Sequence, residues 1–152
     1  MLSGSTFKDY TVTVTGTAGT VTPVQDQESF NLRLKNPCID SNFFSLSSVA
    51  LPAGESYILY DTRHTFQHLE FQIVTNMTSS SLCGPLIYDA NFESSVINGG
   101  TSPMDYDMAI RTFGIYSEDS NLIGLREITV QAKLQDYSSV VSSIETETIE
   151  IF

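Results

Sequence analysis

Alternation of apolar and polar residues with a period of two runs through most of this chain, and the helical period of 3.6 is nearly absent. The segment 124–134 shows it best, because Ile128, Val130, Ala132 and Leu134 share one face, with Arg126 near its edge. Similar segments lie at 10–16, 28–35, 43–49, 56–60, 69–75, 86–92, 109–116 and 144–152. Turn-forming residues separate them. Roughly nine such segments predict an all-β fold, an antiparallel β-sandwich of about seven to nine strands.

Two places interrupt the alternation. Asn36-Pro37 ends the strand before it, because proline has no N–H to donate to a β-ladder. In the segment 109–116, Ile110, Phe113 and Ile115 cannot all share one face, which predicts a bulge or bend near Arg111 and Thr112.

The two ends of the chain resemble each other. The run Tyr10–Val14 matches Ile128–Ala132, and Ser29–Leu34 matches Thr148–Phe152, at an offset of about 118–119 residues, which is a plausible length for a small domain. We therefore expect residues 1–27 to overlap with a preceding repeat and residues 28–152 to form one sandwich repeat, with a terminal strand shared between neighbours. The alternative is two unrelated edge strands of a single sandwich.

The chain is strongly acidic, with 18 Asp and Glu against 7 Lys and Arg and a net charge of −11. Such a surface repels phosphate backbones and anionic lipids, so nucleic acid and membranes are poor candidate partners. No stretch approaches the 18 apolar residues of a membrane-spanning helix. We expect no direct membrane insertion.

Two cysteines, Cys38 and Cys83, are the whole cysteine content, and neither belongs to a C-x-x-C pair. An even number fits one disulfide, which would close a loop of about 45 residues and contribute about 3–4 kcal/mol; two free buried thiols are the alternative. Asn76-Met77-Thr78 is an N-glycosylation sequon. Both features favour an extracellular protein, and because Met1-Leu-Ser-Gly-Ser5 lacks the features of a secretory signal, we expect a mature or excised segment.

Three motifs in order resemble the Ig-like or cadherin-like sandwich repeats of large eukaryotic extracellular tandem-repeat proteins. They are Phe30-x-Leu-x-Leu-x-Asn-Pro-Cys-x-Asp40; Leu82-Cys-Gly84 with Tyr88-x-Ala-x-Phe92; and Phe113-x-Ile-Tyr-Ser-Glu-Asp119 leading to Leu122-Ile-Gly124. Together they cover about two-thirds of the chain. The resemblance implies an Ig-like sandwich at the cell surface or in the matrix, a spacer and contact role without catalysis, and pairing of Cys38 with Cys83.

Calcium is the point where the chain departs from the cadherin pattern. Cadherin-type junctions hold Ca²⁺ with runs such as Asp-x-Asn-Asp-Asn, and none occurs here. Asn36 and Asp40 flank the expected junction and make a thin ligand set. We expect no cofactor beyond weak Ca²⁺ binding, with Asp40 as one candidate ligand.

Two further groups are candidate ligands for a cation. Asp105 and Asp107 lie two residues apart and share a face in an extended chain, as paired carboxylates for Ca²⁺ would; the competing interpretation is a solvated loop. Asp61, His64 and His68 have the spacing of metal ligands on a helix. Because this segment lies between two strands and lacks a third strong ligand, we expect exposed or hydrogen-bonded loop histidines and no metal centre.

Six tyrosines are candidates for contact surfaces. Tyr106 and Tyr137 are flanked by polar residues, so we expect them to be the exposed contact residues and the others to pack in strands. The chain has no Gly-x-Ser-x-Gly elbow, no P-loop and no dinucleotide fingerprint. We therefore expect no enzymatic activity.

The function expected from the sequence is a structural or adhesive repeat that assembles with identical or similar units, by addition of a terminal β-strand. The alternatives are a carbohydrate-binding sandwich, against which the absence of Trp counts, and a viral or fimbrial jelly-roll surface subunit. A glycan is therefore a second possible partner.

Overall fold

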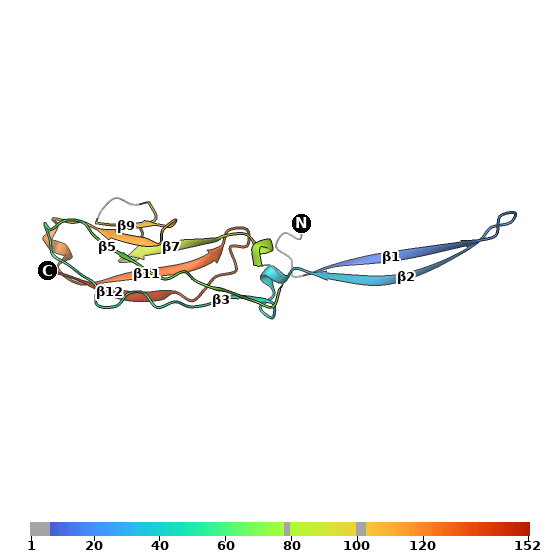
Figure 1. The fold of residues 1–152 in the computed structure, drawn as a ribbon, viewed down its shortest axis with the longest axis horizontal. Helices are drawn as coiled ribbons and strands as arrows, with labels where there is room; N and C mark the ends of the chain where they lie inside the picture. Colours follow the sequence, from blue (N-terminus) through green and yellow to red (C-terminus); the bar gives the residue numbers. More distant parts are fainter. Residues whose placement is uncertain (1–6, 78–79, 100–102) are drawn as a thin grey trace.

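The computed structural model describes residues 7–77, 80–99 and 103–152, and these are nearly all β-strand or loop (Figure 1). The strands are β1 (Phe7–Ala18), β2 (Val24–Lys35), β3 (Phe44–Leu46), β4 (Ser56–Tyr57), β5 (His64–Gln67), β6 (Ile73–Thr75), β7 (Leu86–Phe92), β8 (Ser95–Val96), β9 (Met104–Asp107), β10 (Thr112–Ile115), β11 (Gly124–Leu134) and β12 (Glu145–Ile151). Three 3₁₀ turns, η1 (Pro37–Ile39), η2 (Ser80–Cys83) and η3 (Ser120–Leu122), join some of them. No helix among the described residues is long and apolar enough to cross a membrane.

Residues 36–152 form the body of the molecule, an all-β sandwich. One sheet has five strands in the order β4-β12-β11-β7-β8. The other side consists of β5-β10-β9 and the short pair β3-β6. All pairs are antiparallel except β4 with β12, where Ser56 and Tyr57 run parallel to Glu150 and Ile151.

The strand order is that of an immunoglobulin-like sandwich. On one side, β5 and β6 together take the place of strand B, β9 that of strand D and β10 that of strand E. In the five-stranded sheet, β7, β11 and β12 take the places of strands C, F and G. Strand B is interrupted at 68–72, so that its first part pairs with β10 and its second part with β3. The fold predicted from the alternation and the resemblance is confirmed.

The inner faces of the two sheets share one hydrophobic core. From the five-stranded sheet come Tyr57, Tyr88, Ala90, Phe92, Ile128, Val130, Ala132, Ile149 and Ile151. From the other side come Phe66, Phe71, Met104, Tyr106, Phe113 and Ile115. The predicted core face of β11 is therefore correct, because Ile128, Val130, Ala132 and Leu134 are all buried there.

A disulfide closes one end of the body. Cys38 in η1 and Cys83 in η2 are bonded, with their Cα atoms 5.4 Å apart. Both are buried in a small cluster with Phe44 and Leu134. The disulfide therefore ties the start of the body to the connection before β7.

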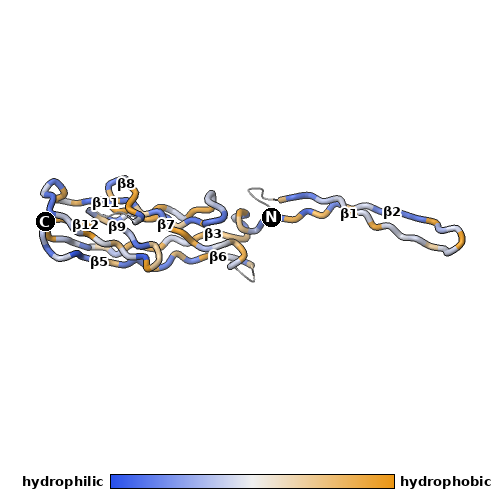
Figure 2. Tube along the Cα trace, turned by 90° about the horizontal axis from the view of Figure 1, so that it is seen from above, coloured by the Kyte–Doolittle hydropathy of each residue, from blue (hydrophilic) through white to orange (hydrophobic). Residues whose placement is uncertain are grey.

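The remaining strands, β1 and β2, form a hairpin that extends away from the body. Both views show it leaving the end of the sandwich opposite the C-terminus, with no other strand beside it (Figures 1 and 2). Its two strands pair along their whole length, from Phe7 with Lys35 to Ala18 with Val24.

The sequence predicted a boundary between residues 27 and 28, but the change from hairpin to sandwich lies at a different position. That boundary falls within β2, and all of β2 pairs with β1. The sandwich begins instead at Asn36, whose side chain accepts a hydrogen bond from the backbone N–H of Cys38 (3.1 Å) and so starts η1.

The double variant Cys38→Ala, Cys83→Ala should lower the free energy of unfolding by about 3–4 kcal/mol, because the disulfide closes a long loop of the unfolded chain. Chemical denaturation followed by circular dichroism measures the change. A loss below about 1 kcal/mol would show that the bond contributes little beyond the packing around it.

Candidate functional site

The hairpin β1–β2 has one apolar and one polar face. Because directly paired residues of antiparallel strands point to the same side, the register assigns every side chain to a face. The apolar face carries Tyr10, Val12, Val14, Phe30, Leu32 and Leu34, and also three charged residues, Lys8, Asp26 and Glu28. Phe30 is 54% exposed and Val14 is 58% exposed. This is the pattern of a sheet with a core face, but on the hairpin that face is open to solvent.

Side-chain pairs on the opposite, polar face link the two strands. Arg33 donates two hydrogen bonds to Asp9, at 2.7 and 2.9 Å. Thr13 and Ser29 share a hydrogen bond of 2.8 Å, and the Thr11 hydroxyl donates to the side-chain oxygen of Asn31 at 3.2 Å. Such exposed cross-strand pairs contribute only a few tenths of a kcal/mol to about 1 kcal/mol each. An isolated two-stranded hairpin is only marginally stable in water, so a partner that covers the apolar face would stabilise the hairpin.

The charge of the chain is distributed unevenly between hairpin and body. The hairpin carries three cations, Lys8, Arg33 and Lys35, and three carboxylates, Asp9, Asp26 and Glu28. The other 4 cations and 15 carboxylates lie in residues 36–152, so the body has all of the net charge of −11. Contact through the neutral hairpin therefore avoids the repulsion that two acidic bodies would meet.

The apolar face also has a hollow. Val14, Gly16, Asp26, Glu28 and Phe30 line a volume of about 430 Å³. It exists because Gly16 has no side chain, and a Cβ built at this position has no atom within 4 Å. A side chain from a partner has room to enter there.

Lys35 contacts the body at its junction with the hairpin. Its Nζ lies 3.8 Å from the carboxylate of Asp40 and 5.9 Å from the ring centroid of Phe43. Hydrogen bonds from the backbone and side chain of Asn42 lower the pKa of Asp40, and Lys35 acts in the same direction. Asp40, expected as a cation ligand, is thus already engaged with groups of the protein.

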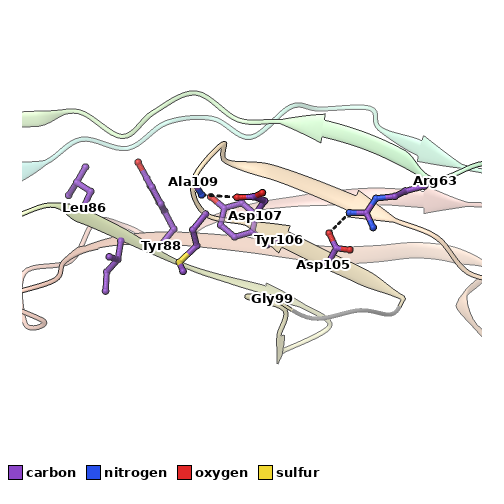
Figure 3. Close-up of a pocket in the computed structure, with 10 residues that line it drawn as sticks. Arg63, Leu86, Tyr88, Gly99, Asp105, Tyr106, Asp107 and Ala109 are labelled. Carbon is purple, nitrogen blue, oxygen red and sulfur yellow. Dashed lines mark hydrogen bonds and ion pairs between the residues drawn. The ribbon is translucent and has the colours of Figure 1, made fainter.

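A second hollow, of about 660 Å³, lies on the body beside β9 (Figure 3). Asp105 forms an ion pair there with Arg63, which crosses β10 over Gly114, where any side chain would collide with the guanidinium. The carboxylate of Asp107 accepts from the backbone N–H of Ala109 at 2.9 Å and so caps a turn. The two carboxylates flank the hollow, but each already has its own partner.

Within the described residues, no group of three or more His, Cys, Asp or Glu side chains could hold a metal ion. His64 lies with its Nε2 2.7 Å from Glu55, while His68 is buried in the core. Both histidines are hydrogen-bonded, but His64 belongs to a strand, β5, that the sequence did not predict, and His68 is buried and not exposed in a loop.

Tyr106 is not the exposed contact residue that the sequence predicted. Its side chain is only 2% exposed, and it lies in the core on β9. Its polar neighbours suggested a loop, but β9 alternates buried Met104 and Tyr106 with the outward Asp105 and Asp107.

The hydroxyl of Tyr106 is bonded to a buried histidine. His68 Nδ1 lies 2.6 Å from the carbonyl oxygen of Leu69, which can only accept. Neutral His68 therefore donates from Nδ1, and its Nε2 accepts from the Tyr106 hydroxyl at 2.6 Å. Burial lowers the pKa of His68 below its ordinary value of 6.5, and the Arg111 cation adds to this against the opposing bond to Leu69.

The other two predicted residues lie on the surface of the body. Tyr137 is half-buried and packs against the cluster that contains the disulfide. Asn76 is exposed directly after β6, and its side-chain N–H donates to the Asn42 carbonyl at 3.3 Å. Thr78, the third residue of its sequon, lies outside the described residues. An exposed Asn76 leaves the glycosylation prediction standing.

Comparisons with known proteins do not connect this geometry to a family. No protein family matches the chain, and no curated protein is significantly similar to it.

The candidate residues expected from the sequence are charged and aromatic residues of the body, and the apolar face of the hairpin is not among them. The signal was present, since both strands alternate and Phe30, Leu32 and Leu34 share one parity. What the sequence did not state was the register, which puts Leu32 opposite Tyr10 and Phe30 opposite Val12, with no other described strand over them.

Stability should fall below about pH 6.5 because of His68. Its pKa is lower in the folded than in the unfolded chain, so as the pH falls the unfolded chain takes up a proton first. Between pH 7 and pH 5 the free energy of unfolding should fall by up to about 2 kcal/mol more for the unsubstituted protein than for the variant His68→Gln. Denaturant titrations of both proteins at each pH measure this. Parallel pH profiles would contradict a buried, neutral His68.

Proposed function

We propose that this chain is a non-catalytic structural or adhesive unit of an extracellular assembly, which joins like units through the hairpin β1–β2. The observation that carries the proposal is the hairpin itself, 24 strand residues with a cluster of exposed apolar side chains on one face and no other described strand over that face. Large exposed apolar patches on soluble proteins mark interaction sites.

The form of the hairpin favours β-sheet addition as the mode of contact. Each of its strands has an outer edge, and main-chain N–H and C=O groups on such an edge can pair with another strand. The side chains of the apolar face would then fix the register, since a slip of one residue would turn all of them outward.

Two features of the body support the extracellular setting. The Cys38–Cys83 disulfide fits an oxidising compartment. Asn76 is exposed, as a glycosylated asparagine must be. The charge distribution adds to the case for assembly through the hairpin, because the acidic body favours solubility while the hairpin is neutral.

The proposal predicts that the full chain self-associates through the apolar face when no other partner is present. Phe30→Asp should raise the dissociation constant by about tenfold or more, because an unpaired carboxylate would be buried in the contact. Sedimentation velocity over a wide range of concentrations measures this.

Ser29→Asp is the matched control, because Ser29 is the neighbouring residue on the polar face. It adds the same charge and should leave association unchanged. Association that responds equally to both substitutions would contradict assembly through this face.

A further inference from the structure

The exposed hairpin has a buried counterpart in the same chain, the strand pair β11–β12. Both are antiparallel pairs of consecutive strands. Four pairs on the apolar face of the hairpin, Tyr10–Leu32, Val12–Phe30, Val14–Glu28 and Gly16–Asp26, correspond in order to Gly124–Ile151, Arg126–Ile149, Ile128–Glu147 and Val130–Glu145. In the body, these are the pairs on the core face.

The second strands of the two pairs carry one pattern. From the turn onward, each has two acidic residues and then two apolar residues at alternate positions on the inner face. In β2 these are Asp26, Glu28, Phe30 and Leu32, and in β12 they are Glu145, Glu147, Ile149 and Ile151. In the second strands, pattern and pairing therefore agree. In the first strands the residue types agree only at Val14 and Ile128.

The pairing also corrects the alignment of the first strands. The sequence matched Tyr10 to Ile128, but the ladders place Val14 there, four residues further on. The connection between the strands is shorter in the hairpin, so one constant offset could not align both strands. Side chains of a strand alternate between its two faces, so a shift of four residues leaves each side chain on the same face and changes only its partner in the ladder.

The surroundings of β11–β12 show what such a strand pair needs. In the body, β7 pairs along β11, and β4 pairs with the end of β12. The second sheet covers the inner face, where Ile128, Val130 and Ile149 are fully buried. The hairpin lacks all three of these neighbours among the described residues.

From this equivalence we infer that the hairpin β1–β2 forms the last strand pair of a neighbouring β-sandwich. That neighbour would have the same design as residues 36–123, and it would lack its own strands at the positions of β11 and β12. The inference rests on the proposed function and names its partner. The outer edge of β1 would pair with a strand like β7, and a sheet like β5-β10-β9 would cover the apolar face.

An intact second copy of the body does not meet these requirements. Its β11 already occupies the edge of β7, and its own Val130 and Ile149 already fill the core. The hollow at Gly16 is consistent with a different neighbour, because Val130 is fully buried at the corresponding position. The partner sheet would supply a side chain that fills this space.

A two-unit chain tests the inference directly. Residues 36–123 are placed before Tyr10 of a following segment 10–152, so that the hairpin takes the positions of β11 and β12 in the first unit. Amide hydrogen exchange is then compared between this protein and the full single chain. Exchange in β1 and β2 should slow by about a hundredfold or more in the two-unit chain, because its strands become part of a closed sandwich.

Three substitutions in the two-unit chain identify the face that is covered. Val14→Asp should return the exchange rates of β1 and β2 to those of the single chain. Thr13→Asp, one residue away on the polar face, should leave the protection intact. Gly16→Val should increase protection, because the covering unit in this protein is residues 36–123, which in the body pack against Val130 at the corresponding position.

The outcomes separate this inference from the proposed function. If the single chain associates through its apolar face but β1 and β2 exchange equally fast in both proteins, the inference is wrong and the assembly contact is between hairpins. If the single chain does not associate and the two-unit chain gives no protection, the proposed function fails as well. Protection in the two-unit chain that Val14→Asp abolishes supports both.

Discussion

The rest of this structure depends on one constraint: the apolar face of a β-sheet must be covered. In the body the constraint is met, since two sheets bury each other's inner faces around Ile128, Val130 and Phe113. In the hairpin the same kind of face remains open, although its polar face is well hydrogen-bonded. The molecule therefore combines a sandwich with a covered core and a two-stranded hairpin with exposed apolar side chains.

This arrangement places stability and contact in different parts of the chain. The body has the core and the disulfide, and with its charge of −11 it repels other bodies. The hairpin is neutral and extends from the body beyond the disulfide, where Lys35 contacts Asp40 and Phe43. A unit with these properties would connect to a neighbour at its end while its long sides stay apart.

The sequence predicted the long strands well and the short ones poorly. The bounds of β7 and β11 agree with the alternation, because one face of each strand is buried and the other is more exposed, which makes their patterns clear. β5, β8 and β9 were missed, since two to four residues are too few to show a period. The bend expected near Arg111 is present: Arg111 has a φ of 54°, and β10 begins only at Thr112.

At the candidate site, residue type predicted exposure less well than the strand pairing did. Tyr106 looked exposed because its neighbours are polar, yet in a strand polar neighbours point to the other side. The similarity of the two chain ends was informative, but only the ladders showed that whole strand pairs correspond and in which register. Register depends on the length of the connecting turn, which a comparison at one fixed offset ignores.

Hydroxyl-radical footprinting tests most directly whether the apolar face is covered in the native assembly. Tyr10 and Phe30 on that face would be compared with Phe7 on the opposite face, in the isolated chain and in material from the native source. We predict that all three react in the isolated chain and that Tyr10 and Phe30, but not Phe7, are protected in the native material. Equal labelling of Tyr10 and Phe30 in both samples would contradict the account.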